Sequence, residues 1–309
     1  CDLDQSFLSI LRKNTSTLKL LRLIHPIVSP HLLENVRVTN LDVLILEGVE
    51  INDSVCTAFL SITSKNVTIL TIFHCSVSPE TVATIGDLCP HLQIFIIQGT
   101  VRMSGALVTV SQKCTQFGDL HVIDMSFRVG DLHRILSHLH QLHILQLARN
   151  LNLTNGDLAV LGREHGADLL VLSLQQCAGY NAAGLCELLK LCPLLTKLFL
   201  ETTPAQITPQ VIECIQHTAL RSLTIFSHTP DEVKHAICRY GKSLTHIGLR
   251  CASHDTDEPY HRIVSECTLL NSFHVFLLPV DVCESIRTAY PWIDVQREAI
   301  PAERVGERD

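Results

Sequence analysis

A hexapeptide of apolar residues returns along this chain at a nearly constant interval, and it constrains the fold more than any other feature. Its pattern is L-x-x-L-x-L, with other apolar residues in place of some leucines. It begins at Leu18, Leu41, Val67, Leu92, Leu120, Leu142, Leu169, Leu195, Leu220, Leu244 and Leu270. Ten steps therefore cover 252 residues (270 − 18), an average of 25.2 residues per step.

Each interval contains a strand followed by a helix. In the unit that begins at Leu169, apolar Leu172 and Leu174 alternate with other residues, which is the period of a strand. The segment from Ala182 to Leu191 has its leucines at helical spacing, and Cys192-Pro193 ends it. A repeat of about 20–29 residues with this content is typical of a leucine-rich repeat. The sequence therefore predicts an α/β leucine-rich-repeat solenoid, a right-handed horseshoe of about eleven full repeats. We expect one continuous parallel sheet with helices on the convex side.

The spacing also predicts the boundaries of the repeat domain. Residues 1–295 form the domain, with the helical half of a repeat at residues 2–15 and a short last strand at residues 291–295. Residues 296–309 form a charged C-terminal tail, and we expect further sequence before Cys1 to cover the first repeat. The steps of 28 and 22 residues between Leu92, Leu120 and Leu142 predict an insertion that is offset by a deletion, with no repeat lost.

Composition argues against several classes of protein. The net charge of −7 disfavours nucleic-acid binding, which usually needs a basic stripe. There is no apolar run long enough to span a bilayer, so we expect no membrane association. The chain also contains no phosphate-binding, dinucleotide-binding, zinc-protease or esterase motif. We therefore expect no enzymatic activity, no catalytic residues and no cofactor.

Histidines and cysteines are the residues most suited to metal binding. His133, His138, His140 and His143 are close in sequence, and we interpret them as a convex surface facet, with a metal site as the alternative. The 13 cysteines include no C-x-x-C pair and recur at fixed positions of the repeat. We therefore expect no metal and reduced, buried thiols. Reduced thiols indicate a cytoplasmic or nuclear protein.

Two strings carry a family resemblance. Residues 88–92 (LCPHL) and 191–195 (LCPLL), together with Cys75 and Cys177 after their strands, resemble the cysteine-containing leucine-rich repeats of F-box/LRR proteins. The turns at residues 207–209 (ITP) and 51–53 (IND) match the same pattern. The resemblance covers about residues 3–295 and implies a substrate-recognition subunit of an SCF ubiquitin ligase. The F-box, which would bind a Skp1-like adaptor, would lie before Cys1. The alternative is an intracellular leucine-rich-repeat scaffold or regulator without a ubiquitin role.

The concave face of the sheet is where we expect a protein partner to bind, because solenoids present extended concave surfaces. We number each repeat from the first residue of its hexapeptide, so that positions three, five and seven face away from the helices. Position three is aliphatic in the first seven repeats, and repeat five contributes Val122, Asp124 and Ser126 at positions three, five and seven. Aromatic and arginine side chains dominate interface energies. The predicted partner-binding residues are Phe73, Arg149, Phe199, Phe226, Arg250 and Phe276.

Overall fold

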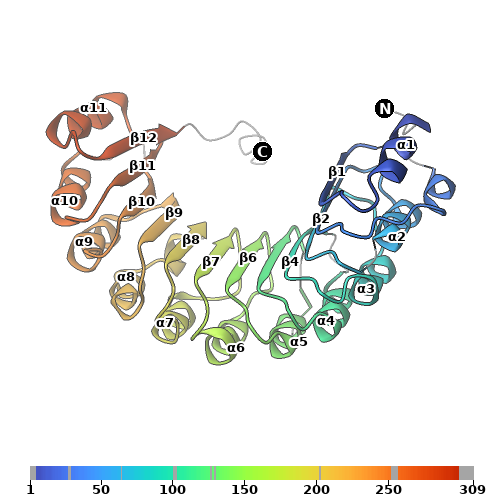
Figure 1. The fold of residues 1–309 in the computed structure, drawn as a ribbon. Coiled ribbons are helices and arrows are strands. Elements are labelled where there is room, and N and C mark those ends of the chain that lie inside the picture. Colours follow the sequence, from blue (N-terminus) through green and yellow to red (C-terminus); the bar gives the residue numbers. More distant parts are fainter. Residues whose placement is uncertain are drawn as a thin grey trace, which may run out of the picture. The chain divides into compact units, whose positions relative to one another are not determined.

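The computed structural model describes residues 5–26, 29–63, 65–99, 103–125, 127–128, 130–201, 203–251 and 257–298. The chain divides into two compact units, residues 1–153 and residues 154–309. Each unit consists of parallel strands on one side and helices on the other (Figure 1).

The described residues of the first unit form six parallel strands, and each strand pairs with the next along the chain. The strands are β1 (Leu20–Ile24), β2 (Val43–Glu47), β3 (Ile69–Phe73), β4 (Ile94–Gln98), β5 (Asp119–Ile123) and β6 (Ile144–Ala148). The helical layer consists of α1 (Gln5–Lys13), the 3-10 helix η1 (Pro30–Leu33), α2 (Asp53–Ile62), α3 (Pro79–Leu88), α4 (Ser104–Lys113) and α5 (Asp131–His138). Consecutive parallel strands joined by a helical crossover are what the 25-residue period predicts.

The second unit repeats this arrangement. Its strands are β7 (Val171–Gln175), β8 (Lys197–Glu201), β9 (Ser222–His228), β10 (His246–Arg250), β11 (Ser272–Phe276) and β12 (Asp294–Glu298), each parallel to the next. Its helices are α6 (Asn155–His165), α7 (Ala182–Lys190), η2 (Pro204–Gln206), α8 (Pro209–Cys214), η3 (Ile215–His217), α9 (Asp231–Tyr240), α10 (Glu258–Glu266) and α11 (Val280–Ala289). The predicted fold class, an α/β leucine-rich-repeat solenoid, is confirmed.

The core lies between each sheet and its helices. Side chains at positions four and six of each repeat point into it, as Leu44 and Leu46 do on β2. Position one is buried as well, and it is occupied by Leu41, Val67 and Leu92 in successive repeats. Each repeat therefore buries its apolar residues against its neighbours, which explains why the period of the hexapeptide is so constant.

The predicted register of the fifth repeat is wrong. Strand β5 begins at Asp119, and its pairing places Asp119 opposite Ile94 on β4 and opposite Ile144 on β6. Position one of this repeat is therefore Phe117, which is buried, and not Leu120. The steps from Leu92 to Phe117 and from Phe117 to Leu142 are both 25 residues. The repeat is regular here, so the predicted insertion and its compensating deletion do not exist.

The misassignment has a simple physical cause. The residues that follow Phe117 offer apolar side chains at two alternative spacings, and only one of the two spacings continues the ladder of the neighbouring strands. Phe117 fills the position of a leucine, and its ring packs edge-on against Phe95, with ring centroids 6.2 Å apart. Because an aromatic residue stands at position one, a search for leucine starts three residues too late.

The residue that follows a strand often adopts a left-handed backbone conformation. His25, His74, Asp124, Arg149 and Gln176 all occupy this position with φ between 46° and 58°. Few residue types other than glycine favour this conformation, so its recurrence marks a turn that the fold imposes. Asp124 is thus equivalent to Arg149, and it lies one residue beyond the strand and not at position five.

Side-chain caps explain where several helices begin. The Asn52 side chain accepts a hydrogen bond from the Val55 amide (3.1 Å) at the start of α2, and Ser78 caps α3 in the same way, followed by Pro79. Ser29 and Thr208 also stand at N-cap positions before a proline, but their hydroxyl groups form no capping bond.

We expect removal of the cap of α6 to destabilise the protein measurably. Thr154 accepts a hydrogen bond from the Asp157 amide (3.2 Å), and Asp157 accepts one from the Thr154 amide (2.9 Å), which forms a capping box. Thr154→Ala should lower the free energy of unfolding by about 1 kcal/mol, measured by urea denaturation. Thr208→Ala is the matched control, because its hydroxyl caps nothing, and an equal loss there would contradict this account.

The cysteine thiols are free in the described part of the chain, and most are buried. Burial raises the pKa of Cys56, Cys89 and Cys192 to about 12, and that of Cys75 to about 11. A thiol whose pKa is raised stays protonated near neutral pH, and only the thiolate reacts rapidly with alkylating reagents.

We therefore expect slow thiol labelling in the native protein. Alkylation by iodoacetamide at pH 8 should be slow without denaturant and should accelerate as the pH rises toward 11. In denaturant, thiol titration should return 13 groups, one for each cysteine of the sequence. A count of three or fewer would contradict the prediction of reduced cysteines.

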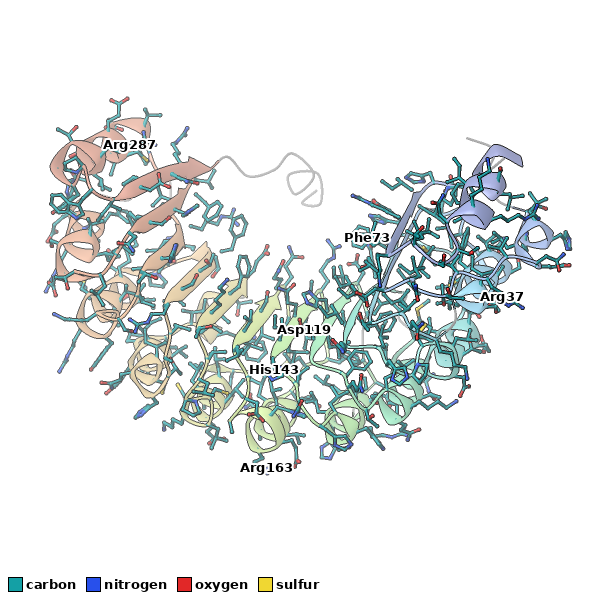
Figure 2. All side chains as sticks on the ribbon, viewed as in Figure 1. Arg37, Phe73, Asp119, His143, Arg163 and Arg287 are labelled. Carbon is teal, nitrogen blue, oxygen red and sulfur yellow. The ribbon has the colours of Figure 1, made fainter. Side chains whose placement is uncertain are left out.

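The two ends of the described chain agree in part with prediction. Helix α1 confirms the predicted N-terminal helix, with Leu8 and Leu11 buried. The last strand runs from Asp294 to Glu298, beyond the predicted end at residue 295. Arg287 (Figure 2) donates two hydrogen bonds to the Val295 carbonyl, at 3.0 and 2.9 Å. Residues 299–309 of the predicted tail lie outside the described residues. None of the described helices is both long and apolar enough to cross a bilayer.

Candidate partner-binding surfaces

The aliphatic sheet face of the first unit is the side of β1–β4 that points away from the helices. Its apolar side chains come from positions three, five and seven of the strands, on the side opposite the described helices of the first unit. They are Leu20, Ile24, Val43, Ile45, Ile69, Phe73, Ile94 and Ile96. Leu20 and Ile24 on β1 are 51% and 52% exposed, and the others are half-buried by one another. Contiguous apolar surface of this kind marks interaction sites in soluble proteins.

Polar side chains replace the aliphatic ones at positions three and five of β5. The prediction that Val122 lies at position three is wrong, because Val122 is buried in the core and Asp119 takes that position. The aliphatic row is therefore interrupted at the fifth repeat. His121 follows at position five, and its Nδ1 lies 2.8 Å from Oε1 of Gln146 on β6. Ser126, which we predicted at position seven, lies outside the described residues.

The carboxyl ends of β4–β6 are joined by a second set of polar contacts. Arg149, one of the predicted partner-binding residues, follows β6 and forms a forked ion pair with Asp124, whose Nη2–Oδ2 distance is 2.5 Å. Gln98 Nε2 donates a hydrogen bond to the same carboxylate at 2.6 Å. The Asp124 carboxylate thus neutralises the charge of Arg149 and holds its guanidinium in one direction, so that this group is oriented and not free to move.

Three predicted residues of the second unit meet on one side of its sheet. The rings of Phe226 and Phe276 pack edge-on with centroids 4.5 Å apart, and the Arg250 guanidinium lies 5.7 Å from the centre of the Phe226 ring. The register of β9 against β10 shifts between Leu249 and Arg250, so that Arg250 pairs with His228. Phe226 lies within this shift, between Ile225 and His228.

The predicted aromatic residues differ in how much surface they expose. Phe226 and Phe276 are only 5% and 8% exposed, because each ring covers the other. Phe199 on β8 and Phe73 on β3 are half-buried, and the Phe73 ring lies 4.3 Å from that of His74. Phe73 and Arg149 belong to β3 and to the end of β6, so the structure does not bring them into one cluster. Partner binding by these six residues stays a prediction.

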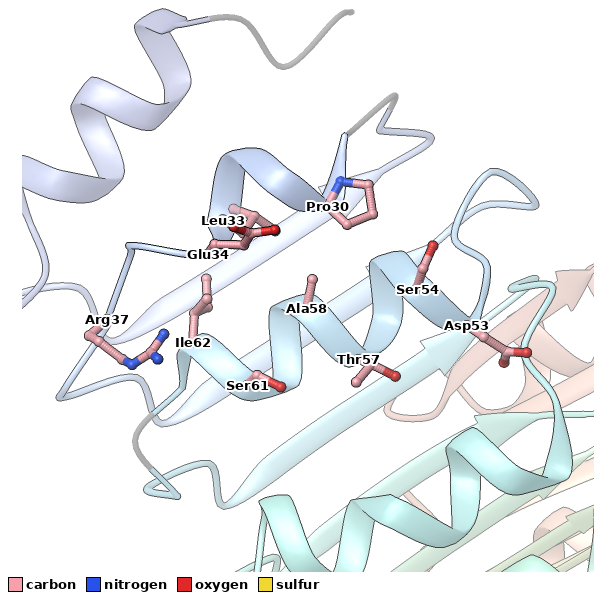
Figure 3. Close-up of a pocket in the computed structure, with 10 residues that line it drawn as sticks. All are labelled: Pro30, Leu33, Glu34, Arg37, Asp53, Ser54, Thr57, Ala58, Ser61 and Ile62. Carbon is pink, nitrogen blue, oxygen red and sulfur yellow. The ribbon is translucent and has the colours of Figure 1, made fainter.

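The sequence did not reveal a groove that lies on the helical side of the first unit. It has a volume of about 590 Å³ and lies between η1 and α2 (Figure 3). The groove exists because this repeat contains one 3-10 turn where its neighbours contain an α-helix. Its apolar lining comes from Pro30, Leu33, Ala58 and Ile62, with hydroxyl groups of α2 beside them. The signal in the sequence was the short interval between Leu18 and Leu41.

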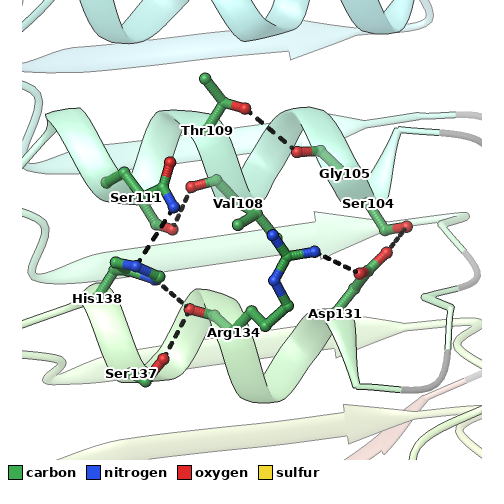
Figure 4. Close-up of polar contacts among 10 residues, drawn as sticks. Ser104, Gly105, Val108, Thr109, Ser111, Asp131, Arg134, Ser137 and His138 are labelled. Atoms are coloured by element: carbon green, nitrogen blue, oxygen red, sulfur yellow. Dashed lines mark hydrogen bonds and ion pairs between the residues drawn. The ribbon is translucent and has the colours of Figure 1, made fainter.

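The four histidines near α5 are exposed or half-buried, and His138 forms contacts on the helical side. His138 Nδ1 lies 2.5 Å from the Arg134 carbonyl oxygen (Figure 4). Its Nε2 lies 3.4 Å from Gln112 Nε2 on α4. In the same region Ser104 donates a buried hydrogen bond of 2.6 Å to Asp131. The part of the chain that the structure describes contains no group of three or more His, Cys, Asp or Glu residues arranged to hold a metal ion.

Comparisons with known proteins give remote likenesses. No protein-family model matches the chain, and no curated protein does. A chain of the yeast Rad7–Elc1 complex is 14% identical, with a TM-score of 0.47, over 77% of this chain and 70% of that one. The leucine-rich-repeat protein LegL7 of Legionella pneumophila is 14% identical (TM-score 0.49; 93% and 91% covered). An internalin of Listeria monocytogenes is 13% identical (TM-score 0.49; 99% and 93% covered). The assignment as an α/β leucine-rich-repeat solenoid rests on the strands and helices of this chain.

Proposed function

We propose that this chain is a protein-interaction module without enzymatic activity, and that it binds a protein partner on the aliphatic sheet face of β1–β4. The observation that carries the proposal is the row of uncovered aliphatic side chains, from Leu20 on β1 to Ile96 on β4. A protein partner that covers them would gain roughly 25 cal/mol for each Å² of apolar surface removed from water.

Charge at the centre of this face should abolish such binding. Ile45 and Ile96 lie at position five of β2 and β4 and are half-buried at the surface of the sheet. We expect the double variant Ile45→Asp with Ile96→Asp to lose protein partners that wild type recovers from cell extract, as quantified by mass spectrometry. Ser54→Asp, in the groove on the helical side, is the matched control and should retain them. Loss with the control and retention with the double variant would move the binding site to the groove.

The more specific function that we propose is substrate recognition in an SCF-type ubiquitin ligase. The resemblance of residues 88–92 and 191–195 to F-box/LRR repeats supports it. A leucine-rich-repeat scaffold or regulator without a ubiquitin role remains the second candidate, since its sheet face would have the same character.

Co-purification separates these two functions. The protein with its natural upstream sequence is purified from cells, and the amounts of Skp1-like adaptor and cullin are measured. A subunit of the ligase should recover both in near-equal molar amounts, and its partner should accumulate when the proteasome is inhibited. Recovery of a partner without the adaptor would favour the scaffold.

A further inference from the structure

Asp119 is a carboxylate in an aliphatic row. Its partners in the sheet are Ile94 on β4 and Ile144 on β6, and all three side chains are half-buried. Among the described residues the Asp119 side chain accepts no hydrogen bond and forms no ion pair; only the imidazoles of His121 and His143 act on it electrostatically. Burial raises the pKa of this carboxyl group. Within the described residues, this carboxyl group therefore has no direct hydrogen-bond or ion-pair partner.

The neighbouring imidazole adds a second acceptor. Nδ1 of His121 lies against Oε1 of Gln146, which can only accept, so Nδ1 carries the hydrogen and donates it. Burial lowers the pKa of His121, which favours the neutral imidazole. In this form Nε2 has no hydrogen and can only accept. Asp119 and His121 thus present two acceptors side by side on β5.

The nearby amide and guanidinium groups do not supply a donor to Asp119. Arg149 is paired with Asp124, and Gln98 Nε2 donates to that same carboxylate. Gln98 Oε1 is buried and accepts no hydrogen bond in the described structure, so it adds negative potential beneath the surface. Between β4 and β6, the Asp119 carboxylate, His121 Nε2 and Gln98 Oε1 are thus acceptors to which no described group donates.

A ligand that complements this region needs several donors, a positive charge and an apolar stem. Arginine meets all three conditions, since its guanidinium carries five N–H donors and no acceptor and forms forked bonds with carboxylates. Its methylene groups can lie along Ile94 and Ile144 while the head reaches Asp119. An ammonium group is more strongly hydrated and lacks the planar fork, so lysine fits less well.

We propose that Asp119 receives the guanidinium of an arginine from the protein partner, with apolar partner residues on either side covering the aliphatic sheet face. This inference rests on the proposed function and names the chemistry of the partner. The net charge of −7 of the chain agrees with a partner segment that is basic and apolar.

A displayed library of random twelve-residue peptides tests the proposal. The library is selected separately on wild type, on Asp119→Asn and on Asp87→Asn. Asp87 lies on the helical side and pairs with Lys113 at 2.6 Å, so its substitution makes the same change in net charge away from the sheet face. The best wild-type peptide is then synthesised with arginine and with citrulline, its neutral isostere, and the Kd values are measured by fluorescence anisotropy.

We expect peptides selected on wild type and on Asp87→Asn to be enriched in an arginine flanked by apolar residues. Replacement of that arginine by citrulline should raise Kd at least tenfold on wild type and less than twofold on Asp119→Asn. The melting temperature of Asp119→Asn should not fall, because the substitution removes a partly buried charge that has no direct partner. A structural role for Asp119 would lower it.

Three results would overturn the proposal, and they differ in their consequence. Selected peptides without a basic residue that are still lost on the Ile45→Asp, Ile96→Asp double variant would leave the proposed function intact and reject the role of Asp119. A citrulline effect of equal size on wild type and on Asp119→Asn would also reject it. Peptides that bind the double variant as well as wild type would instead reject the binding face itself.

Discussion

Val122→Asn should destabilise the protein by about 3 kcal/mol or more, whereas Ile123→Asn should cost less than about 1 kcal/mol. Val122 is 1% exposed and faces the core, so asparagine there loses apolar burial and leaves an amide without hydrogen-bond partners. Ile123 ends β5 on the opposite side, between Gln98 and Ala148, where an amide can reach water. The free energies of unfolding are compared by urea denaturation.

The same pair of variants distinguishes the two registers of the fifth repeat. If Leu120 stood at position one, Ile123 would point into the core and Val122 would face away from the helices. The larger loss would then belong to Ile123→Asn. Such a reversal would contradict the pairing of Asp119 with Ile94 and Ile144, and with it the proposed role of Asp119.

Phe226→Ala should cost about 3–5 kcal/mol of stability, the range for loss of a large buried aromatic side chain. The ring of Phe226 is 5% exposed and packs edge-on against Phe276. Truncation of Phe276 should therefore also lower the stability of the protein. Phe199 is only half-buried on β8, so Phe199→Ala is the control with a smaller expected loss. Thermal and urea denaturation measure all three.

Partner affinity of the folded variants decides between two roles for the aromatic pair. If a ring is an anchor that contacts the partner, its truncation should cost about 2 kcal/mol or more of binding free energy. If the rings only cover each other, their truncation should lower the stability of the protein and leave the partner affinity of the folded fraction unchanged. The burial of Phe226 and Phe276 favours the second outcome, and a loss of affinity without a loss of stability would contradict it.

Most of the fold could be predicted because one constraint repeats. Ten of the eleven hexapeptides lie where the strands are, since a buried leucine at position one or four leaves little freedom of register. A cap residue followed by proline, as at Ser78-Pro79, is a further local signal, and it marks the start of α3. The prediction failed at Phe117, where an aromatic residue took the place of leucine and only the pairing of neighbouring strands determines the register.

The candidate site was harder to predict because it depends on that register. A shift of three residues replaced Asp119 by Val122 at position three, and so the sequence showed an unbroken aliphatic row. The closeness of Phe226 and Phe276 was also hidden, because a bulge in β9 cannot be read from a period of 25 residues. Local chemistry was visible in the sequence, but which side chains share a surface was not.

Site-specific photo-crosslinking tests the central claim most directly. A benzophenone amino acid is placed at Ile96 on the aliphatic sheet face, or at Thr57 in the groove between η1 and α2, and cells are irradiated. Mass spectrometry then identifies the attached protein and the segment of it that reacts. We expect one crosslinked partner from position 96, attached through a segment with an arginine among apolar residues, and none from position 57. Attachment of the partner at position 57 alone would contradict it.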